Sequence, residues 1–408
     1  MNEEEGKVEV RKKMDNGLSM SPNHPSSLAS GAQPSAADYQ SASASTPSPD
    51  STTPTMLQAV HWADAERGHA FAIWLRSLQE RYSLAPESLR LASADASFRR
   101  YLRLNSGHST YGPSVIVMDA PPNQEDSAPF VKVADLLQQA GIRCPQILDW
   151  NQAQGFMLIT DLGEHTMMQR IDPTAPPPLE VYLQAVDTLI AWQKASQPGV
   201  LPPYDHALLR REMDLFPQWY IAQHRQVVLD AAQSQVLEGA FETIIANNLS
   251  WPSVYVHRDF MPRNLMDAGR AHPLGVLDFQ DAVYGPISYD IASLMRDAFV
   301  SWEEDFCLDV TVRYWQRARK AGLPVGDDFG DFYRAVEWMG LQRHIKIAGI
   351  FARLTLRDGK PKYLADTPRF IGYIRATCAR YRELKPLLRL VERLEGIEPP
   401  QAFSFGRV

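Results

Sequence analysis

Cysteine is scarce in this sequence, and it contains no long apolar run. The three cysteines among 408 residues, Cys144, Cys307 and Cys378, are too widely spaced for a metal knuckle or a disulfide framework. We therefore expect buried, reduced thiols. No apolar run reaches the roughly 18 residues that a membrane-spanning helix requires, which argues against a transmembrane protein.

An excess of basic residues is missing as well. Asp and Glu together number 48 against 41 Lys and Arg, which gives a net charge of -7. A protein that binds nucleic acid through general charge attraction would show the opposite balance. Residues 1–5 also lack the basic and apolar regions of a secretory signal. We expect a cytoplasmic protein, with a monomer favoured and with neither nucleic acid nor a membrane as partner.

The first 56 residues differ in composition from the rest. Between residues 15 and 55 Ser, Pro, Ala and Thr dominate, and Val, Ile, Phe and Trp do not occur. Such a segment buries too little apolar surface to offset the entropy lost on ordering. We expect a disordered tail over 1–56. The sequence leaves open two alternatives, a partner-binding segment and a true start at Met56.

Beyond the tail, apolar periodicity predicts a small sheet followed by a helical region. Helices are predicted at 63–78 and 130–140, and strands at 89–91, 98–104, 114–118, 146–149 and 156–160. After residue 163 most segments have helical spacing, namely 179–194, 208–220, 228–247, 287–299, 302–321, 328–356 and 367–380. The sequence thus predicts an α+β fold with an antiparallel-sheet lobe over 57–160 and a larger, mostly helical lobe over 161–408.

A short polar pattern interrupts the helical region. His257 and Asp259 follow a predicted short strand over 251–256, Asn264 comes five residues after Asp259, and Asp278 lies in a second predicted strand over 274–279. Phosphoryl transfer from MgATP needs this layout, because one carboxylate orients the acceptor hydroxyl while an amide and a second carboxylate hold the metal. The spacing therefore favours Asp259 as the base, and Asn264 and Asp278 as Mg²⁺ ligands. The plainer interpretation is a loop in which His257 and Asp259 satisfy only local hydrogen bonds.

A loop without glycine lies between the first two predicted strands, over residues 93–101. Its small and polar residues and its two arginines suit contact with phosphate oxygens. The candidate nucleotide-binding residues are Ser93, Asp95, Ser97, Phe98, Arg99 and Arg100. An ordinary polar hairpin is the alternative. The third strand carries Met118 where a kinase-like fold places a lysine, which leaves either a loop arginine in that role or an inactive protein.

These motifs together resemble those of the aminoglycoside phosphotransferase (choline-kinase-like) superfamily. The resemblance rests on the loop and on residues 158–163, 257–264 and 284–291. It implies a bilobal protein-kinase-like fold with ATP in the cleft and with Asp290 as a structural support of the catalytic loop. The residues that it places at the nucleotide, near the hinge, are Thr160, Asp161 and Leu162.

Longer runs resemble a narrower group, the bacterial anomeric kinases of N-acetylmuramate and N-acetylglucosamine. These runs are residues 93–101, 117–122, 207–212, 257–266, 342–346 and 357–361, and the resemblance spans about residues 60–390. That group also has methionine at the position of Met118. The resemblance implies ATP-dependent phosphorylation of the anomeric hydroxyl in cell-wall recycling, with Mg²⁺ as cofactor and a small amino sugar as acceptor.

The residues that would bind the acceptor are less well defined. N-acetylmuramate carries a carboxylate, which a nearby cation would bind. The candidates are Arg210, Glu212, Arg343, His344 and Lys346, together with Arg263 for the γ-phosphate or the acceptor. Each has a plainer role as a surface charge, on a helix or in the catalytic loop. Another small alcohol, such as an aminoglycoside, and a non-catalytic nucleotide-binding module are the alternatives; a polycationic aminoglycoside would favour acidic residues here.

Overall fold

The computed structural model describes residues 60–62, 64–94, 99–172, 174–267, 269 and 272–398, with only the backbone of Ser93 and Ala94. The predicted tail over 1–56 and the candidate residues Asp95, Ser97 and Phe98 lie outside this part of the chain. Within the described part, no helix combines the length and the apolar character that crossing a membrane requires.

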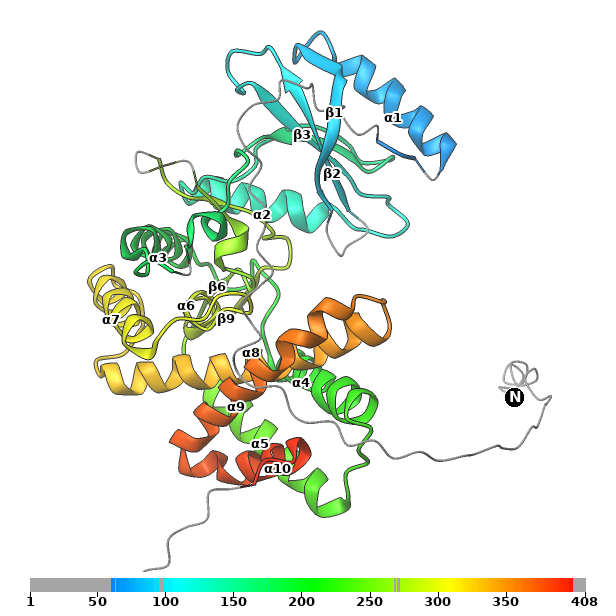
Figure 1. Ribbon diagram of the computed structural model, residues 1–408. Coiled ribbons are helices and arrows are strands. Elements are labelled where there is room, and N and C mark those ends of the chain that lie inside the picture. The colour runs from blue at the N-terminus through cyan, green and yellow to red at the C-terminus, as the bar shows by residue number, and fades with distance from the viewer. Residues whose placement is uncertain are drawn as a thin grey trace, which may run out of the picture. The chain divides into compact units, whose positions relative to one another are not determined.

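An antiparallel sheet with the strand order β1-β2-β3-β5-β4 comes first (Figure 1). Its strands are β1 (Leu84–Ala94), β2 (Arg100–Ser106), β3 (Ser114–Asp119), β4 (Ile147–Asn151) and β5 (Phe156–Thr160). β1 is longer than the predicted strand over 89–91. Shifts of its register against β2, between Ala85 and Arg90 and between Leu91 and Ser93, let an irregular segment continue the strand.

Two helices accompany the sheet, α1 (Ala65–Leu78) and α2 (Ala128–Gln139). Asp64 caps α1, because its carboxylate accepts N–H bonds from Glu66 at 2.9 Å and from Arg67 at 3.3 Å. The buried face of α1 packs on the strands through Phe71, Trp74, Leu75 and Leu78. α2 belongs instead to the larger core that continues into the helical region.

Strand β3 separates these two cores. Val115 and Val117 join the core of α1, whereas Ile116 and Met118 join the core of α2. This alternation follows from the two-residue period of a strand. Met118, at the position where a lysine was expected, is therefore fully buried among apolar side chains.

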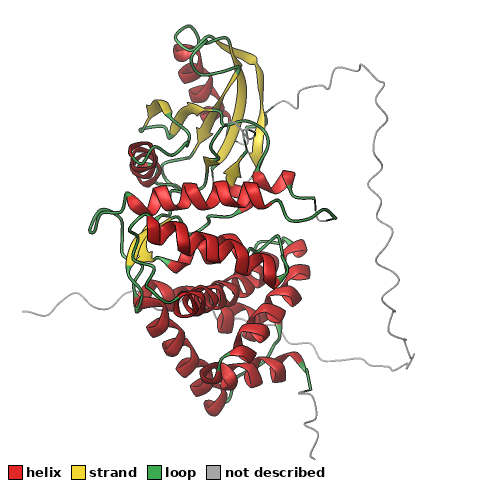
Figure 2. Ribbon diagram, turned by 90° about the vertical axis from the view of Figure 1, so that its left-hand side faces the viewer, coloured by secondary structure: helices red, strands yellow, loops and turns green. Residues whose placement is uncertain are grey.

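The remainder of the described chain is mostly helical (Figure 2). Its helices are α3 (Leu179–Lys194), α4 (His206–Met213), α5 (Ala231–Leu249), α6 (Ser288–Met295), α7 (Glu304–Lys320), α8 (Phe329–Leu356), α9 (Thr367–Arg380) and α10 (Lys385–Glu395). The predicted helix over 208–220 is divided, because α4 ends at Met213 and a π-helical segment, Phe216–His224, follows. Pro217 has no N–H with which to bond the carbonyl of Met213, so α4 does not continue.

Two short antiparallel strand pairs interrupt the helices. β6 (Ser253–Val256) pairs with β9 (Val283–Pro286), and β7 (Leu265–Met266) pairs with β8 (Gly275–Val276). The strand predicted at 274–279 is thus reduced to two residues. The chain leaves β6 directly before His257 and leaves β8 two residues before Asp278.

Helix α8 is the central element of the helical part and contacts α4, α5, α6, α7 and α9. Every residue from 335 to 345 is buried, so this stretch is covered on all sides, as in a core helix. The buried stretch includes four polar side chains, Glu337, Gln342, Arg343 and His344. Glu337 binds Arg380 and Tyr381 at the end of α9. Buried polar groups need partners, and those of the other three residues lie in the segments described next.

Candidate active site

The two strand pairs, β6–β9 and β7–β8, bring the predicted catalytic residues together. Asp259 lies in the loop after β6, and Asn264 closes the single 3-10 turn Pro262–Asn264 before β7. The pairing of β7 with β8 continues with a bond from the Leu277 N–H to the Asn264 carbonyl at 2.9 Å. This register places Asp278 beside Asn264.

The amide of Asn264 joins the other two residues. Its Nδ2 donates to the backbone carbonyl of Asp259 at 2.9 Å and to Oδ2 of Asp278 at 3.3 Å. Gln280 donates to the other oxygen of Asp278 at 2.8 Å. Because both amide bonds use the nitrogen, the Asn264 side chain presents its oxygen as the ligand atom.

This donor set fits a hard divalent cation. An amide oxygen and an exposed carboxylate are oxygen ligands of the kind that Mg²⁺ prefers, and Mg²⁺ typically keeps several waters and substrate phosphates as its other ligands. No group of three or more His, Cys, Asp or Glu side chains in the described residues is arranged to hold a metal. Asn264 and Asp278 are the residues that would hold the ion.

His257 is a buried, neutral support of the loop. Burial lowers the pKa of its imidazole to about 4, so the ring is uncharged at neutral pH. Nε2 lies 2.9 Å from the Leu277 carbonyl, and the Asp259 N–H lies 3.3 Å from Nδ1. These partners assign the proton to Nε2, which donates, while Nδ1 accepts. His257 therefore connects the base-bearing peptide with the segment that delivers Asp278.

Two residues of the site have a left-handed backbone. Arg258 has φ 77° and Asp278 has φ 60°, although neither is glycine. Such a conformation costs a non-glycine residue on the order of 1–2 kcal/mol. It persists only where surrounding contacts hold it, and such residues gather at functional sites.

Asp290, on α6, supplies part of this support. Its two carboxylate oxygens accept the N–H groups of His257 at 2.7 Å and of Arg258 at 3.0 Å. Burial raises the pKa of Asp290 to about 7, while the two N–H bonds and the charge of Arg343 act in the opposite direction. The supporting role that the resemblance implied for Asp290 corresponds to this geometry.

The side chain of Arg258 belongs to a buried ion-pair cluster with Glu212 and Lys346. Its NH2 lies 2.6 Å from Oε1 of Glu212, and Nζ of Lys346 lies 2.9 Å from the same oxygen. Oε2 of Glu212 accepts bonds from Tyr204 and from Gln342, the latter at 3.1 Å. Glu212 and Lys346 are thus brought to the catalytic loop, and their role as acceptor-side residues stays a prediction.

The predicted nucleotide-side arginines have protein partners. Arg100 binds Oδ2 of Asp119 through Nε at 3.0 Å and NH2 at 2.6 Å, and Arg67 binds Oδ1. Arg99 is buried and lies 3.1 Å from Glu125. Arg100 therefore ties β2 to β3 and α1, and Arg99 ties the loop to the segment before α2.

The segment that leaves β5 is also held by side chains. Arg103 binds both oxygens of Asp161, at 2.6 and 3.0 Å, and Ser114 donates to the same carboxylate at 2.7 Å. The Thr160 hydroxyl accepts the Gln146 N–H, and the Leu162 carbonyl accepts from Arg143. Asp161 thus fastens this segment to β2 and β3.

Arg210 and Arg263 have contacts away from the loop's polar core. Arg210 points to α5, where it binds Glu238 and Glu242, and it also pairs with Asp214 at 2.8 Å. Arg263 is exposed, and its guanidinium carbon lies 4.7 Å from the centre of the Phe299 ring. The structure does not bring Arg210 to the catalytic loop.

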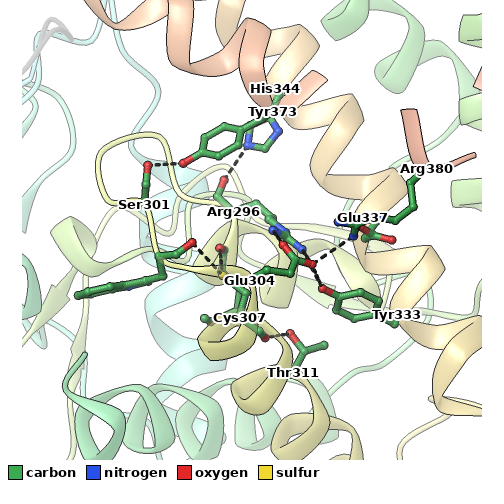
Figure 3. A network of polar contacts seen from close by, with 12 residues as sticks. Arg296, Ser301, Glu304, Cys307, Thr311, Tyr333, Glu337, His344, Tyr373 and Arg380 are labelled. Atoms are coloured by element: carbon green, nitrogen blue, oxygen red, sulfur yellow. Dashed lines mark hydrogen bonds and ion pairs between the residues drawn. The ribbon is translucent and has the colours of Figure 1, made fainter. Parts of the chain in front are cut away.

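Arg343 and His344 differ from the predicted acceptor contacts. Arg343 is 2% exposed and donates to the Arg258 carbonyl at 2.6 Å, so it lies behind the loop. His344 faces another network, in which its Nε2 lies 3.1 Å from the Arg296 carbonyl (Figure 3). Burial lowers the pKa of His344 to about 3, so this ring is a neutral core group. Both contacts are to backbone carbonyls of the protein.

Sequence reasoning missed several residues that organise the site. Arg103 and Tyr204 lie outside every motif, and Asp119 belonged to the run 117–122 without a role of its own. Arg103 is 58 residues from its partner Asp161, and Asp119 is 52 residues from Arg67. Arg258 belongs to the motif 257–264, but nothing in the amino-acid sequence indicated its positive φ. The apolar run before Asp119, which predicts a buried strand end, was the available signal for that residue.

Comparison with known proteins identifies the protein family of this chain. Residues 88–328 match the phosphotransferase enzyme family. The chain belongs to this family. Its catalytic motif, five-stranded sheet and helical remainder agree with that membership.

Within the family, the chain is similar to a particular group of kinases. It is 48% identical to the N-acetylmuramate/N-acetylglucosamine kinase of Neisseria meningitidis serogroup B, over 79% of this chain and 95% of the relative. It is also 48% identical to the kinase of the same name from Pseudomonas aeruginosa, over 77% of this chain and 90% of the relative. The resemblance inferred from the sequence motifs is confirmed.

Solved structures confirm the fold class. A choline/ethanolamine kinase family protein from Mesorhizobium loti aligns with a TM-score of 0.52 at 14% identity, covering 80% of this chain and 99% of that one. The ADP-bound aminoglycoside phosphotransferase APH(2'')-Ib aligns with a TM-score of 0.50 at 14% identity, covering 76% and 97%. The predicted bilobal, kinase-like α+β fold is therefore correct.

Proposed function

We propose that this chain is an ATP- and Mg²⁺-dependent kinase that phosphorylates the anomeric hydroxyl of N-acetylmuramate, N-acetylglucosamine or both. The observation that carries the proposal is the convergence of Asp259, Asn264 and Asp278 beside the two strand pairs, in a chain 48% identical to kinases named for these sugars. Conversion of such sugars to 1-phosphates would serve the reuse of cell-wall material.

Asp259 is the proposed base. It accepts the proton of the C1 hydroxyl while that oxygen bonds to the γ-phosphorus, and the bond from the γ-phosphorus to its bridging oxygen breaks to release ADP. Positioning and charge stabilisation carry most of the catalysis in phosphoryl transfer, so one well-placed carboxylate is enough. The peptides on both sides of Asp259 are held, by His257 and by Asn264.

Asn264 and Asp278 are the proposed ligands of Mg²⁺, which supplies neutralisation of the phosphate charge when it is bound. The nucleotide lies, in this proposal, between the lobe over 57–160 and the lobe over 161–408. Thr160, Asp161 and Leu162 are the proposed junction, and Arg99 and Arg100 are the described residues proposed for the phosphate side. The ties of Asp161 to β2 and β3 support a defined geometry at this junction.

Lys346 is the proposed cation for the acceptor carboxylate. It is joined through Glu212 to Arg258, next to Asp259, and its positive charge is stabilised by Tyr289 and Glu212, which raise its pKa against the effect of burial. N-acetylmuramate has a lactyl carboxylate that N-acetylglucosamine lacks. A cation at this position would distinguish the two sugars.

We expect Lys346→Met to reduce kcat/KM for N-acetylmuramate by about tenfold more than for N-acetylglucosamine, since a charge-assisted bond contributes roughly 1.5–3 kcal/mol. Steady-state kinetics with both sugars measure this ratio. Lys360→Met, which removes a lysine beyond the end of α8, is the control and should leave the ratio unchanged. An equal loss for both sugars would remove Lys346 from the recognition of the carboxylate.

The experiment that tests the proposed function is an acceptor panel. Purified protein is incubated with MgATP and N-acetylmuramate, N-acetylglucosamine, choline or kanamycin, and ADP and product are quantified. Phosphate at C1 of the amino sugars, seen by ³¹P and ¹H NMR, is the expected result. Turnover confined to choline or kanamycin would retain phosphotransfer but replace the acceptor, and no turnover with any acceptor would contradict the proposal.

A further inference from the structure

The peptide bond between Arg258 and Asp259 is held from both of its edges. The carbonyl oxygen of Arg258 accepts NH1 of Arg343 at 2.6 Å, and the N–H of Asp259 points to Nδ1 of His257 at 3.3 Å. In a planar trans peptide these two groups point in opposite directions. Together the two contacts oppose rotation of the peptide that precedes the base.

The same residue is held at two further points. Its N–H donates to Asp290 on α6, and its guanidinium binds Glu212 on α4. Three helices, α4, α6 and α8, therefore converge on one residue whose φ of 77° is unfavourable. Because these contacts hold Arg258 in its left-handed conformation, they also fix the direction in which the next residue, Asp259, presents its side chain.

Arg343 is itself firmly placed. It belongs to the stretch of α8 that is buried on all sides, and its guanidinium carbon lies 4.8 Å from the centre of the Tyr289 ring. A planar guanidinium stacked in this way offers its N–H groups in a fixed geometry, which a lysine ammonium does not reproduce. Burial acts to lower the pKa of Arg343, but Tyr289 and the nearby carboxylates of Asp259 and Asp290 raise it, so the guanidinium stays charged.

We propose that Arg343 is a positioning residue for the catalytic base: through the Arg258 carbonyl it fixes the peptide that carries Asp259. The inference rests on the proposed function, in which Asp259 is the base. It also replaces the expectation that Arg343 reads the sugar carboxylate. A positioning residue affects both sugars equally, whereas a carboxylate reader affects N-acetylmuramate alone.

A second buried arginine nearby provides a matched control. Arg296 binds Glu304 at 2.8 and 2.9 Å and Tyr333 at 3.0 Å, in the network of Figure 3. It joins α6, α7 and α8 on the side where His344 lies, and the partners of its guanidinium, Glu304 and Tyr333, lie outside residues 257–264. Arg296→Lys therefore reports the cost of losing a buried guanidinium without disturbing the base.

The experiment compares Arg343→Lys, Arg343→Gln and Arg296→Lys. We expect both Arg343 variants to lose about 100-fold in kcat, because a displacement near 1 Å has such an effect. KM for MgATP should change by less than about threefold, and the loss should be equal for N-acetylmuramate and N-acetylglucosamine. Arg296→Lys should lower the melting temperature and leave kcat within about threefold. Two Arg343 variants are used so that, if one of them misfolds, the other still tests the proposal.

A second readout does not depend on turnover. Hydrogen-exchange mass spectrometry of the peptide containing Asp259 should show faster exchange in the Arg343 variants, by about tenfold or more, and no change in Arg296→Lys. Unchanged exchange and unchanged kcat would overturn the proposal. A loss confined to N-acetylmuramate would assign Arg343 to the carboxylate instead. An inactive wild type would contradict the proposed function, and the exchange data alone would then decide whether Arg343 holds this peptide.

Discussion

Glu212 shows how a single buried carboxylate organises the residues behind the catalytic loop. Burial alone would raise its pKa, yet the charges of Lys346 and Arg258 and the bond from Tyr204 outweigh this effect and lower the pKa to about 2. Both of its oxygens have two donors. Removal of one member of such a buried group leaves the remaining charges without compensation.

The lowered pKa predicts how stability depends on pH. Glu212 is ionised in the folded state well below its ordinary pKa of 4.5, so its contribution is complete above pH 5 and is lost as pH falls from about 5 towards 2. We expect Glu212→Gln to be less stable than the wild type by about 3 kcal/mol at pH 7. This difference should shrink between pH 5 and pH 3 in urea unfolding. A difference that stays constant over this range would show that ionisation of Glu212 is not the cause.

At the same scale, sequence and structure agree where the signal is local. Asp259, Asn264 and Asp278 lie within one short stretch, and residue type and spacing were enough to predict their convergence. The tie between Arg103 and Asp161 joins residues 58 apart in sequence, and nothing in either neighbourhood indicates the other. The role of Arg343 depends on which backbone carbonyl it meets, which no composition or period shows.

Helix α8 packs closely against the segment after α4 at Gly349. An added Cβ at Gly349 would lie 2.4 Å from the carbonyl carbon of Leu215 and 2.5 Å from its oxygen. Leu215 directly precedes the π-helical segment Phe216–His224 and follows α4, which carries Glu212. The absence of a side chain at Gly349 therefore lets α8 approach the segment that supports the ion-pair cluster.

Gly349→Ala is expected to destabilise the protein by about 1–3 kcal/mol, because the added methyl group meets backbone rather than a movable side chain. Gly372→Ala is the control, since that glycine lies inside α9 with open space around its Cβ position. Alanine there should stabilise the helix by about 0.5–1 kcal/mol. Urea unfolding of both variants measures the difference. Equal effects of the two substitutions would refute the close crossing.

The prediction of elements from sequence succeeded where periodicity is strong and failed at interruptions. The long helix over 328–356 was predicted nearly to its ends, because its apolar period is sustained. The predicted helix over 208–220 missed the break at Pro217. The strand over 274–279 was predicted too long, because an apolar run before Asp278 reads as a strand even where only two residues pair.

At the scale of the whole molecule, the site lies where chain from the sheet region meets the helical region. The Val276 N–H donates to the Arg143 carbonyl at 2.8 Å, and the Asp267 N–H donates to the His165 carbonyl at 2.9 Å. The β7–β8 pair, which precedes Asp278, is therefore hydrogen-bonded to the segments around β5. Membership of the phosphotransferase enzyme family accounts for this arrangement, whereas the boundary at residues 160 and 161 stays a prediction.

The most direct test of the central claim is formation of sugar 1-phosphate by the wild type, Asp259→Asn and Asp281→Asn with MgATP and both amino sugars. Asp281 is an exposed carboxylate close to the same loop and serves as the matched control. We predict product with the wild type and Asp281→Asn, and a loss of at least about 1,000-fold with Asp259→Asn. Substantial product from Asp259→Asn, or none from the wild type, would contradict the account.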